Sequence, residues 1–243
     1  MKLSNIVVSL ICISFMMIIL ITSSRSNIED NSNLSSIEII NKKNDTVVKS
    51  INNDISKEDS LKKKKELEEN QKLEEEKNRK ENVKYVRENI TIPSNITKEE
   101  MKQVLLKYKG ASTMAHLSDA FIDSENKYGV NSFVMAAIVA LESGFATSRR
   151  AVEDNNLTGY EVYTDESEGR LFSSQYESVI HTARHLSKNY LTPGAIYYNG
   201  LSVDAVQIKY CPDEGKGKHW EKKVDILASG LLNTYKDIYL NNK

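Results

Sequence analysis

The stretch SFVMAAIVALESGFATSRRAVEDNNLTGY, Ser132–Tyr160, decides the fold. Its apolar run from Ser132 to Leu141 carries no charge, which predicts a helix buried on all sides at the centre of a domain. The run ends in Glu142, and Ser143-Gly144 predicts an immediate turn. This glutamate is either an ordinary last-turn residue that points to solvent, or an acid in apolar surroundings. Burial and the negative end of the helix would both keep such an acid protonated toward neutral pH.

The chain as a whole divides into three parts of different composition. The whole has 243 residues, 28% of them charged, and a net charge of −1, which gives no electrostatic reason to expect nucleic acid as a partner. The composition changes near residues 26 and 95. We therefore expect three regions: a membrane-directed segment at 1–26, a linker at 27–95 and a folded domain at 96–243.

The N-terminal segment has the composition of a signal peptide or membrane anchor. Met1-Lys2 precedes the uncharged run IVVSLICISFMMIIL, Ile6–Leu20. We therefore expect the remainder on the extracellular face of the membrane or in the cell wall. Cys12 lies in this run, so the exported part holds a single cysteine, Cys211, and one thiol cannot form an intramolecular disulfide. We interpret it as a small buried hydrophobe.

The linker changes character halfway along. Its first half is rich in Asn, Ser, Asp and Lys, which predicts disorder. Its second half alternates blocks of Lys and Glu, which predicts a solvated, semi-rigid helix that ends before Pro93. Leu61, Leu67 and Leu73 are six residues apart and not seven, so a coiled coil is the less favoured alternative.

The folded domain is predicted to be mostly helical. Thr97 and Glu100 form a capping-box pattern, one helix should end at Gly129, and another should begin near Ser173 or Ser174. The exception is YEVYTDESEGRLF, Tyr160–Phe172, whose β-prone ends predict a hairpin or ordered loop. The expected class is α+β, a lysozyme-like helical domain with a small β-hairpin lobe.

The pattern ALESGFATSRRAVEDNNLTGY resembles the signature of the peptidoglycan glucosaminidases of glycoside hydrolase family 73, in which an LESG glutamate is followed by NN or YN and Leu-Phe-Gly. The downstream SSQYESVIHTARHLSKNYLTPGAIYYNGLSVDAVQIKYCPDEGKGKHWEKKV is similar to that family's closing region. The resemblance covers about Ala111–Tyr235. It implies an endo-β-N-acetylglucosaminidase that cuts peptidoglycan glycan strands, with Glu142 as general acid and no metal or cofactor.

The chain departs from that family pattern at three places. Phe145-Ala146 stands where the family has Trp-Gly, and Thr158 replaces an aromatic residue. The segment VYTDE matches the family's AYD only at Tyr163. These changes concern the cleft wall, so they bear on substrate preference and rate more than on the fold.

A second catalytic carboxylate is expected in the Tyr160–Phe172 segment, where the candidates are Glu161, Asp165, Glu166 and Glu168. We favour Asp165 or Glu166, because a loop tip can fold over a cleft. All four can equally be solvated loop charges. The 2-acetamido group of the substrate is a third option, which would need none of them.

Sugar binding requires aromatic faces and polar partners. The predicted substrate-binding residues are Tyr210, which matches the tyrosine of the family's KY stretch, and Tyr163, Tyr160, Asn156 and Trp220. Asn156 can also brace the loop after Glu142. His181 and His185 lie four apart, but no HExxH or third ligand accompanies them, so we interpret them as helix surface and predict no metal site.

Two other functions remain open. The same fold could serve an N-acetylmuramidase or an amidase on the same substrate, or a non-catalytic peptidoglycan-binding module. In each case we expect a monomer, with peptidoglycan and the membrane as its partners.

Overall fold

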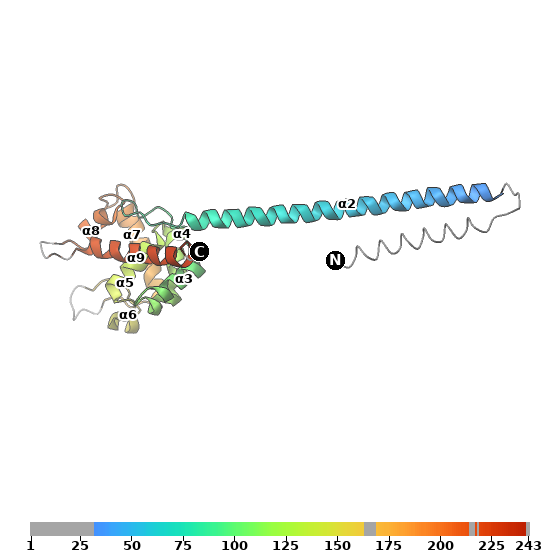
Figure 1. Cartoon of the computed structure of the whole chain (residues 1–243). Coiled ribbons are helices and arrows are strands. Elements are labelled where there is room, and N and C mark those ends of the chain that lie inside the picture. The colour runs from blue at the N-terminus through green and yellow to red at the C-terminus, as the bar shows by residue number, and fades with distance from the viewer. Residues whose placement is uncertain (1–31, 163–168, 214–216, 218, 242–243) are drawn as a thin grey trace. The chain divides into compact units, whose positions relative to one another are not determined.

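A computed structural model describes residues 32–162, 169–213, 217 and 219–241 (Figure 1). The chain divides into two compact units, Met1–Glu69 and Asn70–Lys243. The segment expected to enter the membrane, residues 1–26, lies outside the described residues. Within the described ranges, no helix combines the length and the hydropathy needed to cross a bilayer.

The linker is helical through most of its length. Helix α2, Ser32–Glu81, includes the half that composition predicted to be disordered, so that prediction is wrong from Ser32 onward. A helix satisfies its own backbone hydrogen bonds without a core. In this half, moreover, the Thr46 and Ser50 hydroxyls donate to the helix carbonyls of Lys42 and Val47.

The leucines of α2 do not form a seam. Six residues advance a helix by about 240° beyond a whole turn, so Leu61, Leu67 and Leu73 point in three different directions. Each is more than half exposed, at 55%, 59% and 63%. The structure therefore gives no support to a coiled coil.

The folded unit begins at Asn70, well before the boundary expected at residue 96. Val83 and Ile90 are buried in its core. Arg79 binds the carboxylate of Glu100 with both terminal guanidinium nitrogens, at 2.9 and 2.6 Å, and the Glu100 side chain is 7% exposed. The C-terminal end of α2 and the chain after it are therefore part of the domain.

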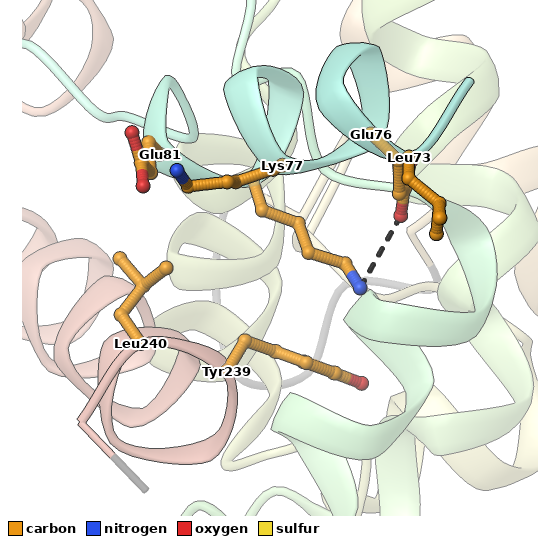
Figure 2. A pocket seen from close by; sticks show the side chains of 7 residues that line it. Leu73, Glu76, Lys77, Glu81, Tyr239 and Leu240 are labelled. Carbon is orange, nitrogen blue, oxygen red and sulfur yellow. Dashed lines mark ion pairs between the residues drawn. The ribbon is translucent and has the colours of Figure 1, made fainter. Parts of the chain in front are cut away.

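The end of α2 also contacts the end of helix α9, Trp220–Tyr239 (Figure 2). Lys80 pairs with Glu76 at 3.3 Å, and its ammonium lies 5.8 Å from the centre of the Tyr239 ring. A groove of about 380 Å³ remains between the two helices, lined by Leu73, Glu76, Lys77, Lys80, Glu81, Tyr239 and Leu240. Glu142 is not among these residues, so this groove is separate from the candidate site.

The domain is built around helix α5, Ser132–Ser143, which is buried over nearly its whole length and packs against α9, α4 and α7 (Figure 1). The capping box of Thr97 and Glu100 and the helix end at Gly129 are confirmed. The other helices are α3 (Lys98–Lys107), η1 (Ser112–Leu117), α4 (Ser118–Tyr128), α6 (Arg149–Glu153), α7 (Gln175–Leu186), η2 (Ser187–Leu191) and α8 (Val203–Tyr210).

The hairpin expected at Tyr160–Phe172 is not supported. Residues 163–168 lie outside the described part, and the flanks that are described contain no strand. One backbone hydrogen bond joins them, from Arg170 N to Tyr160 O at 3.0 Å. The Asn156 amide also bonds to the backbone of both residues, so a side chain ties the two flanks together where a strand ladder was expected. The described residues thus form a helical fold without strands, and the α+β class holds only in its helical part.

Candidate active site

Glu142 lies in the last turn of α5, one residue before the helix ends. The chain then makes a tight turn in which Gly144, Phe145 and Ala146 all have positive φ angles, of 57°, 60° and 62°. The Ser143 hydroxyl accepts a hydrogen bond from Ala146 N at 2.8 Å, and Thr113 donates to the Phe145 carbonyl. These contacts fix the backbone on the C-terminal side of the acid.

The carboxyl group of Glu142 accepts a hydrogen bond at Oε1 from Trp220 Nε1, at 2.7 Å. The residue is exposed to solvent where it lines two hollows, although protein atoms packed near the carboxyl group partly desolvate it. Burial raises the pKa of this carboxyl above its ordinary value, and the bond from Trp220 acts in the opposite direction. The raised pKa is the property that a general acid requires.

Two hollows meet at Glu142. One has a volume of about 220 Å³ and is lined by Leu141, Glu142, Cys211, Trp220 and Lys223. The other has a volume of about 430 Å³ and is lined by Glu142, Ser148, Arg149, Arg150, Asn156, Gly159 and Val162. Because the acid belongs to both, an extended ligand could place one unit on each side of it.

A row of aromatic rings leads away from Glu142. Trp220 packs against Tyr210 with ring centres 5.1 Å apart, Tyr210 against Tyr190 at 5.7 Å, and Tyr190 against His185 at 5.7 Å. Burial raises the pKa of the Tyr210 hydroxyl, and the charge of Glu142 adds to this effect. Of the predicted aromatic residues, Tyr210, Trp220 and Tyr160 belong to this row, whereas Tyr163 lies outside the described residues.

The two histidines are part of the same row, which the sequence analysis missed. Tyr160 packs edge-on against His181 and His185, with centres 4.4 and 5.5 Å away. Burial lowers the pKa of both rings, and Arg170 lowers that of His181 further. Among the described residues, no group of His, Cys, Asp and Glu could hold a metal ion. The four-residue spacing of the histidines was the available signal, but it was judged only against metal binding.

Asn156 connects the flanks of the loop that borders the larger hollow. Its Nδ2 donates to Tyr160 O and Arg170 O, both at 3.0 Å, and its Oδ1 accepts from Tyr160 N at 2.9 Å. The residue is 2% exposed. It therefore both lines the hollow and holds the adjoining loop.

We expect Asn156→Ala to lower the free energy of unfolding by about 2–3 kcal/mol, because buried backbone groups lose their partners. Glycan cleavage should also fall as the loop is released. Urea unfolding and a cleavage assay measure the two effects. The exposed Asn126 on α4 offers a control, since Asn126→Ala should change neither. Equal stability of the two variants would contradict the bracing role.

The predicted second carboxylates, Asp165 and Glu166, lie outside the described residues, as does Glu168. Glu161 is described; it is exposed and has a φ of 60°. Thr158, which replaces a family aromatic residue, lies 2.8 Å from Thr182, hydroxyl to hydroxyl. It therefore forms an internal contact between the loop and α7.

The chain is similar to a glucosaminidase family and to proteins described by the same activity. Residues 118–229 match the family "Glucosaminidase: Mannosyl-glycoprotein endo-beta-N-acetylglucosaminidase". Two proteins of Streptococcus pneumoniae, from serotype 4 and from strain R6, are each described as "Putative endo-beta-N-acetylglucosaminidase". Each is 24% identical over 147 residues, which is 56% of this chain but only 20% and 19% of the two relatives. The chain therefore spans about one fifth of their length.

Two solved structures of S. aureus Autolysin E are also similar. A catalytic mutant in complex with the disaccharide NAG-NAM is 17% identical, with a TM-score of 0.47, and covers 64% of this chain and 75% of its own. A complex with the muropeptide NAM-L-ALA-D-iGLU is 17% identical, with a TM-score of 0.41, and covers 63% and 72%.

Proposed function

Residues 118–229 match the glucosaminidase family, and on this premise we propose that the protein is a cell-wall hydrolase that cuts peptidoglycan glycan strands at N-acetylglucosaminyl bonds. The observation that carries the proposal is Glu142, a carboxyl with a raised pKa at the junction of two hollows. A strand passing the acid would place sugars on both sides, as cleavage within a chain requires.

In the proposed reaction, Glu142 donates its proton to the glycosidic oxygen as the bond to the sugar breaks. Positive charge then develops on the sugar ring, and a second group assists the attack of water. Burial favours the protonated acid at the start of this step. The partly exposed rings of Tyr160 and Tyr210 supply faces for sugar rings, and Asn156 supplies a polar lining.

The second group is part of the same proposal. Asp165 or Glu166 would act as a base if the loop at 163–168 folds over the larger hollow, or as a nucleophile if it comes closer. The carboxyl separation distinguishes these roles, at about 6.5–9.5 Å for inversion and about 5–5.5 Å for retention. The 2-acetamido group of the substrate is the alternative nucleophile.

We propose that the protein works at the outer face of the membrane or in the wall, as a monomer. The apolar composition of residues 1–26 supports a membrane anchor or signal peptide. The charged helix α2 supports a solvated tether between that segment and the domain.

Digestion of purified peptidoglycan by the full chain, followed by mass spectrometry of reduced products, tests the reaction. We expect N-acetylglucosamine at the new reducing ends. Muramic acid at those ends would mean an N-acetylmuramidase, and released stem peptides with intact strands would mean an amidase. A folded protein that sediments with the wall and cuts nothing would be a binding module, which would refute hydrolysis.

A further inference from the structure

We propose that Trp220 is a positioning residue that decides which oxygen of Glu142 carries the catalytic proton. Its indole N–H holds Oε1 as an acceptor, so Oε2 is the oxygen that delivers the proton to the substrate. This inference rests on the proposed function, because it assigns the orientation of the same acid.

The assignment follows from the chemistry of indole. The Nε1–H group of tryptophan can donate a hydrogen bond but cannot accept one. The bond of 2.7 Å from Trp220 Nε1 to Glu142 Oε1 therefore requires a lone pair on Oε1. In a protonated carboxyl the carbonyl oxygen is the better acceptor, which leaves the hydroxyl on Oε2. A tyrosine could donate or accept, so it would not select one oxygen.

Trp220 is held firmly enough to impose this choice. It is 4% exposed, begins α9 and packs against the ring of Tyr210. The preceding His219 has a φ of 47°, and α9 packs along α5, the helix that carries the acid. Donor and acceptor therefore come from two packed helices. This burial also argues against a sugar-stacking surface as the main role of the indole.

The bond has a second effect, which opposes that of burial. A hydrogen bond to the carboxylate favours the ionised form, so Trp220 limits the rise in the pKa of Glu142. Removal of the indole should raise this pKa further. The same substitution should also slow proton transfer, because the acid loses its orientation.

The first test needs no substitution of Trp220. It is the only tryptophan in the chain, so its indole N–H gives a single NMR resonance in the full-length protein. We expect this resonance to shift with pH as Glu142 titrates, and the titration to vanish in Glu142→Gln. An indole resonance that does not respond to pH in the wild type would overturn the proposal.

The second test compares full-length Trp220→Phe with the wild type on peptidoglycan fragments. We expect the alkaline limb of kcat/KM to move up by about one pH unit. We also expect kcat to fall at least tenfold, with a smaller change in KM. Phenylalanine keeps an aromatic face, so a stacking role would instead raise KM and leave the limb in place. That result would overturn the positioning role.

Tyr235→Phe is the matched control, because it removes a buried hydroxyl elsewhere on α9, at 3.4 Å from Lys80 O. It should leave the pH profile unchanged, and a shift equal to that of Trp220→Phe would mean a general effect of disturbing α9. If the wild type cleaves peptidoglycan but the alkaline limb of kcat/KM does not move in Trp220→Phe, the positioning role of Trp220 is refuted and the proposed function is not. No cleavage by the wild type would refute the proposed function and the positioning role with it.

Discussion

Glu142→Gln is expected to lower the rate of glycan cleavage by about 10²- to 10⁴-fold, which is the usual contribution of a general acid. The amide has almost the same shape, and its oxygen can still accept the hydrogen bond from Trp220. The fold should therefore persist. The decisive measurement is the turnover rate on reduced glycan fragments, with Glu99→Gln as a control because Glu99 is exposed on α3.

The same variant should change how stability depends on pH. The pKa of the Glu142 carboxyl is higher in the folded protein than its ordinary value of 4.5, so the folded state holds this proton more tightly. The wild type should therefore lose stability as pH rises from about 4.5 through the raised pKa. Gln has no such slope, so the variant should gain relative stability over that window. If the thermal unfolding temperatures of both proteins changed with pH in the same way across this range, the raised pKa of Glu142 would be contradicted.

A fragment that begins at Ile96 is expected not to fold, whereas one that begins at Asn70 should fold cooperatively. The shorter fragment lacks Val83 and Ile90, whose burial contributes about 1.5–3 kcal/mol each. It also leaves the Glu100 carboxylate without Arg79, at a cost of about 3–5 kcal/mol. Together these losses reach the range of total domain stability, which is about 5–15 kcal/mol. Circular dichroism and urea unfolding compare the two fragments.

A single substitution checks the same argument within the full chain. Arg79→Ala should cost about 3–5 kcal/mol, because the buried Glu100 loses its partner. Lys127→Ala removes an exposed ion pair with Asp123, which solvent screens, and should leave the free energy of unfolding almost unchanged. A cooperative unfolding transition of the Ile96 fragment, or equal costs for the two substitutions, would show that the end of α2 is dispensable.

The features that the sequence predicted well are local. The capping box at Thr97, the glycine at 129 and the apolar run ending in Glu142 depend on residues within a few positions of one another. The domain boundary predicted at residue 96 missed the end of α2, because Arg79 lies in a run of Lys and Glu residues whose composition predicts a solvated helix. Its partner Glu100 is 21 residues away and becomes visible only after folding.

The candidate site shows the same difference between local features, which the sequence predicts, and long-range contacts, which it does not. The apolar neighbours of Glu142 left its role open, and the family resemblance implied the general acid. Its hydrogen-bond donor is 78 residues away, so no local pattern could pair it with Trp220. The family resemblance agrees with the family that matches residues 118–229. Trp220 was assigned to substrate binding as an aromatic face, whereas the structure has its indole bonded to the acid. The hairpin failed because composition favoured strands, while the Asn156 side chain binds the backbone of both flanks.

The turn after Glu142 affects which substitutions this part of the chain can tolerate. Left-handed backbone costs a non-glycine residue about 1–2 kcal/mol, and Phe145 and Ala146 both adopt it. At these positions a substitution must first fit the left-handed backbone, whatever the chemistry of its side chain. Glycine should be accepted there, whereas valine or isoleucine should be excluded. Sequence variation next to the acid would then follow conformational cost, and residues that contact no sugar could still be constrained because they fix the direction in which the acid points.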